Sequence, residues 1–219
     1  MPEFAHKYNI HMLLMLHFII NFHFLGNIHY IHYIYYLTVK TINMETNKKA
    51  IDVIFKRTSV RHYSNKKISD EQIETILRAG MAAPSGMNIQ PWRFIIIRNR
   101  EVMDNLGKEL PYAKMLSKAD GAIIVCGDIN SSENKDLQKL WIQDCSAASE
   151  NILLAITSLG LAGLWTAVYP YKDRMAIVEK YCKTPENIIP LNVIPIGYPA
   201  EDYSPKDKWD PSKIHKEQW

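Results

Sequence analysis

Cysteine is scarce in this sequence, with three in 219 residues and no CxxC spacing. Cys126, Cys145 and Cys182 therefore provide neither the disulfide framework of a small secreted domain nor the ligand spacing of a structural zinc site. An excess of one charge is also lacking, because 26 basic and 23 acidic residues leave a formal net charge of +3 at pH 7. We expect a cytoplasmic protein with no nucleic-acid partner and no bound metal.

Long hydrophobic runs and common enzyme motifs are missing as well. The most apolar stretch, 12–24, is interrupted by His17 and His23, and it is shorter than the roughly 20 residues that span a bilayer. We therefore expect no membrane partner. The chain also contains no glycine-rich nucleotide loop, serine-nucleophile elbow or paired-histidine zinc motif. A thiol catalyst made of Cys182 and His215 would have nothing to orient it.

The first 43 residues differ in composition from the rest of the chain. They hold six of the eight histidines and only three charged residues, Glu3, Lys7 and Lys40. Histidine-rich runs can bind metal, but this one has no Cys, no Asp and no regular helical spacing to complete a ligand set. We interpret 1–43 as an atypical extension, an artefact of cloning or gene prediction. The domain itself is then expected to cover 44–219, with Met44 as the natural start.

Apolar spacing predicts alternating helices and strands after Met44. Helices are expected over 45–57, 70–83, 135–159 and 172–180, the second of them started by a capping box of Ser69 and Gln72. Strands are expected over 94–97, 122–126 and 188–196, the first two buried on both faces in the middle of a sheet. Small residues in the long central helix would let another helix approach, from a second subunit or from the same chain. The tail from Gly197 should wrap over a surface.

The segment RTSVR is a candidate anion site. Residues two apart in an extended segment face the same way, so Arg57, Ser59 and Arg61 would present two guanidinium groups and a hydroxyl on one side. Arginine makes bidentate, charge-assisted hydrogen bonds to phosphate, so this face suits a phosphate group. The alternative is that these cations only interact with the dipole at a helix C-terminus.

The segment PSGMNIQPW is a candidate pocket loop. Pro84, Gly86 and Pro91 force a non-helical turn. The turn leaves Ser85, Asn88 and Gln90 with free hydroxyl or amide groups. Such neutral donors and acceptors can bind the edge of a heteroaromatic ring. The alternative is an ordinary turn whose side chains bond to its own backbone.

Together the segments resemble one known family in order and spacing. RTSVRHY, PSGMNIQPW, SLGLAGLWTA and IPIGYPAED make 49–219 similar to the FMN-dependent nitroreductases. The resemblance implies an α+β fold with a mixed β-sheet flanked by helices, and a homodimer with FMN at the subunit interface. The long central helix would then lie at the dimer interface.

The resemblance also implies which residues contact FMN, none of them a catalytic acid or nucleophile. Arg57, Ser59 and Arg61 would hold the phosphate and part of the ring edge, and Pro84, Ser85 and Asn88 would come from the partner subunit. Against the flavin ring would lie Leu164, Trp165 and Thr166, with Gln143 as a weaker candidate. In the tail, where the family commonly has a basic residue and often Arg, this chain has Lys206 and Lys208.

The activity that the resemblance implies is a two-step, ping-pong electron transfer. NAD(P)H would reduce the bound flavin and leave, and a nitroaromatic, quinone or related acceptor would then take the electrons in the same site. The flavin supplies the redox chemistry, and the protein supplies binding, orientation and electrostatics. The alternative is a non-catalytic FMN-binding or redox-sensing module, because cofactor residues alone do not establish turnover.

Overall fold

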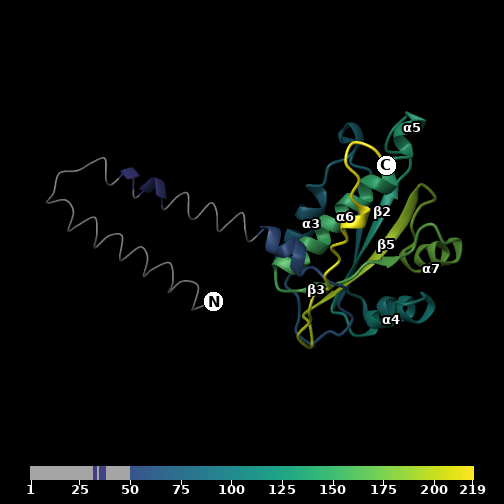
Figure 1. Ribbon diagram of the computed structural model, residues 1–219. Helices are drawn as coiled ribbons and strands as arrows, with labels where there is room; N and C mark the ends of the chain where they lie inside the picture. The colour runs from purple at the N-terminus through teal and green to yellow at the C-terminus, as the bar shows by residue number, and fades with distance from the viewer. Residues whose placement is uncertain (1–31, 34, 38–49) are drawn as a thin grey trace. The chain divides into compact units, whose positions relative to one another are not determined.

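The structure is a computed structural model that describes residues 32, 33, 35–37 and 50–219 (Figure 1). The chain divides into two units between Asp52 and Val53, and the second unit carries the sheet. Residues 50–56 are helical, as expected for the end of the first predicted helix. Most of the predicted extension and the stretch 45–49 lie outside the described residues, so the domain boundary at Met44 stays a prediction.

An antiparallel sheet forms the centre of the second unit. Its order is β1-β2-β5-β3, and β4 also pairs with β5. The strands are β1 (Trp92–Ile97), β2 (Gly121–Asp128), β3 (Ala162–Gly163), β4 (Thr166–Ala167) and β5 (Ile188–Gly197). The named strands pair antiparallel, and a single parallel bridge joins Ser59 to Gly163. The predicted α+β class is confirmed.

The prediction that the first two strands are both central holds for β2 only. Every residue from Gly121 to Gly127 is buried, and β2 lies between β1 and β5. β1 is an edge strand among the described strands, and its residues Arg93 and Ile96 are exposed. An isoleucine-rich run favours a strand, but it does not reveal whether that strand has one neighbour or two.

The helices match the prediction at most positions. They are α3 (Asp70–Met81), α4 (Arg100–Glu109), α5 (Lys135–Gln138), α6 (Trp141–Ser158) and α7 (Lys172–Cys182). The capping box is present, since Ser69 Oγ accepts from Gln72 N and Gln72 Oε1 accepts from Ser69 N, both at 3.1 Å. Short 3-10 turns are η1 (Gly86–Asn88), η2 (Lys114–Ser117) and η3 (Pro211–Lys213).

The helices of the structure differ from the prediction at two places. The single helix expected over 135–159 is interrupted at 139–140, because Leu140 and Trp141 pack closely against Gly86 and Gly127. A Cβ added to Gly86 would lie 2.6 Å from Leu140 Cδ1, and a Cβ added to Gly127 would lie 2.2 Å from Trp141 Cε3. The helix α4 was not predicted. Its signal was present in the sequence, as an Asn99 cap whose Oδ1 accepts from Val102 N at 3.1 Å and a buried face that includes Met103.

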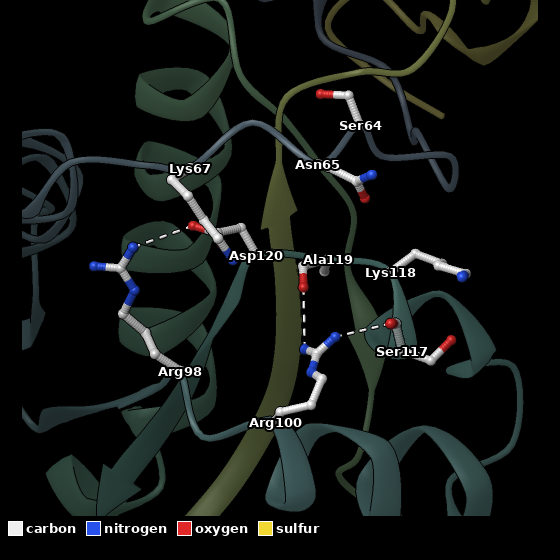
Figure 2. A pocket seen from close by; sticks show the side chains of 9 residues that line it. All are labelled: Ser64, Asn65, Lys67, Arg98, Arg100, Ser117, Lys118, Ala119 and Asp120. Atoms are coloured by element: carbon white, nitrogen blue, oxygen red, sulfur yellow. Dashed lines mark hydrogen bonds and ion pairs between the residues drawn. The ribbon is translucent and has the colours of Figure 1, made fainter.

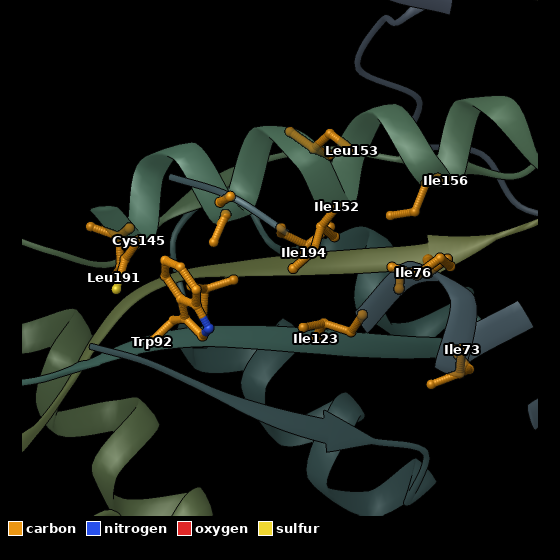
Figure 3. Close-up of a cluster of buried hydrophobic side chains, with 14 of the residues drawn as sticks. Ile73, Ile76, Trp92, Ile123, Cys145, Ile152, Leu153, Ile156, Leu191 and Ile194 are labelled. Atoms are coloured by element: carbon orange, nitrogen blue, oxygen red, sulfur yellow. The ribbon is translucent and has the colours of Figure 1, made fainter. Parts of the chain in front are cut away.

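The sheet is buried on both faces, and we name each face by its main helix. The α6 face contains side chains of α3, α6 and alternate sheet positions, and Figure 3 shows Ile152 lying over Ile194 and Ile123. The α4 face contains side chains of α4, η2 and α7 with the intervening sheet positions, among them Ile124 and Val193. This alternation follows from the period of two in a strand.

Candidate functional site

Residues 57–61 run extended beside β3. The Val60 N–H donates to Gly163 O at 3.3 Å, and Ser59 forms the parallel bridge to the same residue. Val60 is buried in the α4 face, whereas Ser59 and Arg61 are exposed. The chain therefore places Ser59 and Arg61 as the alternation in RTSVR predicts.

Arg57 lies against α6. Its Nε is 3.5 Å from Glu150 Oε1, and its side chain is only 18% exposed. No other ion pair or hydrogen bond of the guanidinium exists within the described part of the chain, so Nη1 and Nη2 are unused. The Arg57 N–H also donates to Val53 O at 3.0 Å, so the residue does stand at a helix C-terminus. A largely covered guanidinium with unused donors fits an anion such as phosphate.

The turn after α6 packs closely against the sheet. A Cβ on Gly163 would lie 3.0 Å from Pro195 O and 3.3 Å from Ile156 Cδ1, so little more than glycine fits there. Leu164 is buried, and Trp165 packs half-buried against the core of the α6 face. This turn therefore joins the segment 57–61 to the C-terminal part of α6.

Thr166 differs from its neighbours in orientation. It pairs with Val193, whose side chain belongs to the α4 face, so the register directs the threonine side chain away from α6. Its Oγ1 is buried with no hydrogen-bond partner among the described residues. A ligand on the α6 face would thus meet the main chain of Thr166 and not its hydroxyl.

The loop 84–90 is held in an unusual backbone conformation. Met87, Asn88 and Gln90 have φ of 50°, 57° and 54°, and left-handed non-glycine residues cost on the order of 1–3 kcal/mol each. The loop is fixed by bonds from Gly86 N to Asp144 Oδ1 and from Gln90 N to Ser85 Oγ, both at 3.0 Å. Such local strain, held by specific bonds, is typical of ligand-binding loops.

Ser85 and Asn88 differ in how many of their side-chain hydrogen-bonding groups are used within the chain. Because Ser85 Oγ caps its own turn, the backbone-bonding alternative holds for this residue. Asn88 accepts from Gln90 Nε2 at 2.9 Å through its carbonyl oxygen, which leaves its amide N–H groups for a ligand. Pro84 and Asn88 are both exposed.

The predicted residues form two groups at different positions along α6. Asp144, beside the exposed Gln143, holds the loop 84–90 near the start of the helix, whereas Arg57 meets Glu150 six residues later and Gly163 contacts Ile156 twelve residues later. At 1.5 Å per residue these two contacts lie about 9 Å and about 18 Å along the helix from Asp144. A single chain therefore does not gather both groups into one cluster.

The tail residues Lys206 and Lys208 belong to neither group. The tail starts beside 62–64, where Ser64 N donates to Tyr198 O at 2.9 Å and Ala200 N donates to His62 O at 3.1 Å. Lys206 and Lys208 are exposed, and within the described residues neither forms an ion pair or a hydrogen bond. Their role at a phosphate stays a prediction.

A cavity of about 360 Å³ lies outside both groups, between the loop 64–67 and the turn before β2 (Figure 2). At its side Asp120 accepts from Lys67 Nζ at 2.8 Å, from Arg98 Nη2 at 3.1 Å and from Ile68 N at 2.9 Å. Burial opposes ionisation of Asp120, but these bonds outweigh it and lower the pKa of the carboxyl. Asp120 thus connects three segments as a structural ion pair.

Arg100, at the floor of the same cavity, uses its side-chain donors in hydrogen bonds within the protein. Arg100 Nη1 donates to Ser117 O at 2.8 Å, and Nη2 donates to Ala119 O at 3.1 Å. The arginine thereby satisfies main-chain carbonyls at the end of η2. None of the residues predicted to contact FMN lines this cavity, so we do not assign the flavin to it.

The cysteines have no nucleophilic environment. Burial raises the pKa of both Cys126 and Cys145 to about 12, and Cys145 Sγ donates to Cys126 O at 3.4 Å. These thiols are neutral core residues. Among the described residues no cluster of potential ligands for a metal ion occurs, and no helix is both long and apolar enough to cross a bilayer.

Sequence reasoning missed two acidic residues of α6 that shape these groups, Asp144 and Glu150. Asp144 is 7% exposed and holds the loop 84–90, and Glu150 pairs with Arg57. Their partners lie 58 and 93 positions away in sequence. No local spacing signals such long-range contacts.

The chain is similar in sequence and structure to several known proteins. The sequence pattern of the Nitroreductase family matches residues 54–120. The "Putative NADH dehydrogenase/NAD(P)H nitroreductase" of Methanothermobacter thermautotrophicus is 44% identical over 169 residues, covering 77% of this chain and 87% of the relative. A crystal structure of the same name from Bacteroides thetaiotaomicron is 53% identical, with a TM-score of 0.74 over 78% of this chain and 98% of that chain.

A second solved structure carries the cofactor in its name. The "FMN-dependent Nitroreductase" of Clostridium difficile R20291 is 26% identical, with a TM-score of 0.71 over 77% of this chain and 99% of that chain. The fold, the ordered segments and these similarities agree with one another. The chain belongs to the nitroreductase family.

Proposed function

We propose that the protein is an FMN-dependent oxidoreductase that passes electrons from NAD(P)H to nitroaromatic, quinone or related acceptors in two successive steps. The observation that carries this proposal is Arg57, whose mostly covered guanidinium has no partner for Nη1 and Nη2 among the described residues and lies beside the exposed Ser59 and Arg61. The relatives named NAD(P)H nitroreductase and FMN-dependent nitroreductase support the donor and the cofactor.

Different residues of the α6 face would contact different parts of FMN. When bound, FMN supplies the two-electron redox chemistry. Arg57 would hold the phosphate through its terminal nitrogens, and Ser59 would add a neutral donor. Arg61 would place positive charge near the ring edge, where negative charge develops on reduction. Trp165 and the main chain of Thr166 would lie along the ring.

The test is a visible absorption spectrum of the purified protein, recorded before and after anaerobic NADH or NADPH. If the protein is an enzyme, the absorption of its flavin should bleach on reduction and recover each time a nitroaromatic or a quinone is added. Protein that binds FMN but does not bleach with either nucleotide would favour the non-catalytic flavin-binding alternative. Colourless protein that takes up no added FMN would contradict the proposal itself.

We further propose that the site is shared between two copies. The loop 84–88 and the segment 57–61 meet α6 at separate positions in one chain, so a second copy packed along α6 in the opposite direction would supply its loop to the first. One stripe of α6 supports this arrangement. Its exposed and half-buried positions outside the Arg57 ion pair recur at helical spacing, and they are Gln143, Ala147, Leu154 and Ser158.

Complementation tests the shared site. Arg57→Ala and Asn88→Ala chains, each defective alone at limiting FMN, are co-expressed with different affinity tags. If assembly is random, about half of the dimers are mixed and each has one intact site, so about a quarter of the wild-type sites should return. Sites built within one chain would show no recovery, which would refute the sharing without affecting the proposed chemistry.

A further inference from the structure

We propose that Glu150 is a positioning residue, which orients the Arg57 guanidinium so that its terminal edge faces the FMN phosphate. The inference rests on the proposed function and goes beyond it, because Glu150 itself would not touch the cofactor. It concerns a carboxylate on α6 that no FMN contact requires, in an ion pair with the best-placed cation of the site.

The contact involves one particular nitrogen of the arginine. Glu150 Oε1 lies 3.5 Å from Nε. A guanidinium is planar, with Nε on one side and the two terminal nitrogens forming a separate edge, so an anion can bind Nη1 and Nη2 while Nε stays paired. The contact therefore leaves free the edge that a bidentate phosphate bond needs.

The two partners are unequally exposed. The Glu150 side chain is 49% exposed, whereas the Arg57 side chain is 18% exposed. Glu150 belongs to a helix that is fixed on either side of it by buried residues, Ser149 and Ile152. An isolated arginine has many rotamers, and holding one of them before FMN arrives lowers the entropy cost of binding. The carboxylate would thus pre-order the phosphate contact.

The experiment compares Glu150→Gln, Glu150→Asp and wild type for their affinity toward FMN and toward riboflavin, which lacks the phosphate. We expect Glu150→Gln to weaken FMN binding about two- to fivefold, the range of a partly exposed ion pair. Riboflavin binding should not change, and Glu150→Asp should restore part of the loss. Fluorescence titration of the apoprotein measures all of these constants.

The matched control is Glu74→Gln. Glu74 pairs with Arg78 at 2.6 Å on α3, and their side chains are 63% and 77% exposed. The substitution therefore removes a paired carboxylate that lies outside the proposed site. We expect it to leave FMN affinity unchanged. Thermal unfolding of each variant shows whether a change in affinity reflects a change in stability.

A double-mutant cycle then separates positioning from general effects. If Glu150 acts through Arg57, Glu150→Gln should have no further effect in an Arg57→Ala or Arg57→Lys background. An equal loss in those backgrounds, an equal loss for riboflavin, or unchanged or tighter FMN binding by Glu150→Gln would each overturn the inference. If Arg57→Ala alone leaves FMN affinity intact, the proposed phosphate role of Arg57 fails first, and the inference fails with it.

Discussion

Helices cover both faces of the sheet, but Arg57 on one face and Glu109 on the other differ in how far their polar atoms are used within the protein. On the α6 face, Arg57 makes one side-chain contact, with Glu150, and its Nη1 and Nη2 have no partner among the described residues. On the α4 face, the ion pairs join structural elements to one another. Glu109 at the end of α4 accepts hydrogen bonds from Lys180 and Tyr181 of α7.

This difference indicates where a ligand can bind. A charged group whose partners are all within the protein gains little from a further anion, as Arg100 illustrates at the floor of the cavity. A covered guanidinium with unused nitrogens gains a charge-assisted bond. Unused hydrogen-bond donors, more than the volume of a cavity, are therefore the basis for proposing the α6 face as the site.

The largest effect on the α6 face is expected from Arg57→Ala. Loss of a charge-assisted bond to phosphate should weaken FMN binding by about 1.5–3 kcal/mol, which is roughly a 10- to 150-fold rise in the dissociation constant. Titration of FMN fluorescence with apoprotein measures the change. Mutant protein that stays fully yellow after long dialysis would remove Arg57 from the site.

Next in size is Asp144→Ala, which tests the loop group on the same face. The carboxylate is 7% exposed and accepts from Gly86 N at 3.0 Å, so its loss should lower the free energy of unfolding by about 1–3 kcal/mol. FMN binding should weaken as well, because the loop loses its anchor. Urea unfolding and FMN titration are the measurements, with Asp144→Asn as the control that keeps an acceptor oxygen.

A smaller effect is expected from Asn99→Ala on the α4 face. Asn99 Oδ1 caps α4 by accepting from Val102 N at 3.1 Å, and loss of such a cap costs about 1 kcal/mol of stability. FMN affinity should stay at the wild-type value. A clear loss of FMN binding with little loss of stability would break the distinction between the faces.

The smallest effect is expected from thiol reagents at pH 8. Burial raises the pKa of Cys126 and Cys145 from 9.0 to about 12, so the folded protein keeps both thiols neutral and should react very slowly. Below pH 9 both thiols are neutral in the folded and the unfolded chain, so their full contribution to stability is present there. Above pH 9 only the unfolded chain ionises, so the free energy of unfolding falls until the pH passes about 12. Rapid labelling of both residues in native protein would contradict their burial.

Much of the fold was predictable from local patterns. The capping box of Ser69 and Gln72 marks the start of α3, and the continuous apolar run of β2 identifies a central strand. The errors have physical causes. The position of β1 depends on whether a further strand pairs with it, and the break before α6 depends on Leu140 packing against a distant glycine, Gly86.

The candidate site was predictable only in part. Alternation in RTSVR identified the exposed positions Ser59 and Arg61, because local geometry determines them. The acidic partners Asp144 and Glu150 could not be predicted, since their contacts depend on how α6 packs against distant segments. The direction of the Thr166 side chain likewise follows from its pairing with Val193, which is a tertiary property.

Hydrogen exchange of the apoprotein and the FMN-loaded protein compares the two faces most directly. Bound FMN should slow amide exchange in 57–61, 84–90 and 163–166, and leave the turn 117–120 beside the cavity unchanged. Protection of 64–67 and 117–120 in place of those segments would put the ligand in the cavity of Figure 2, and would contradict the assignment of the flavin to the α6 face.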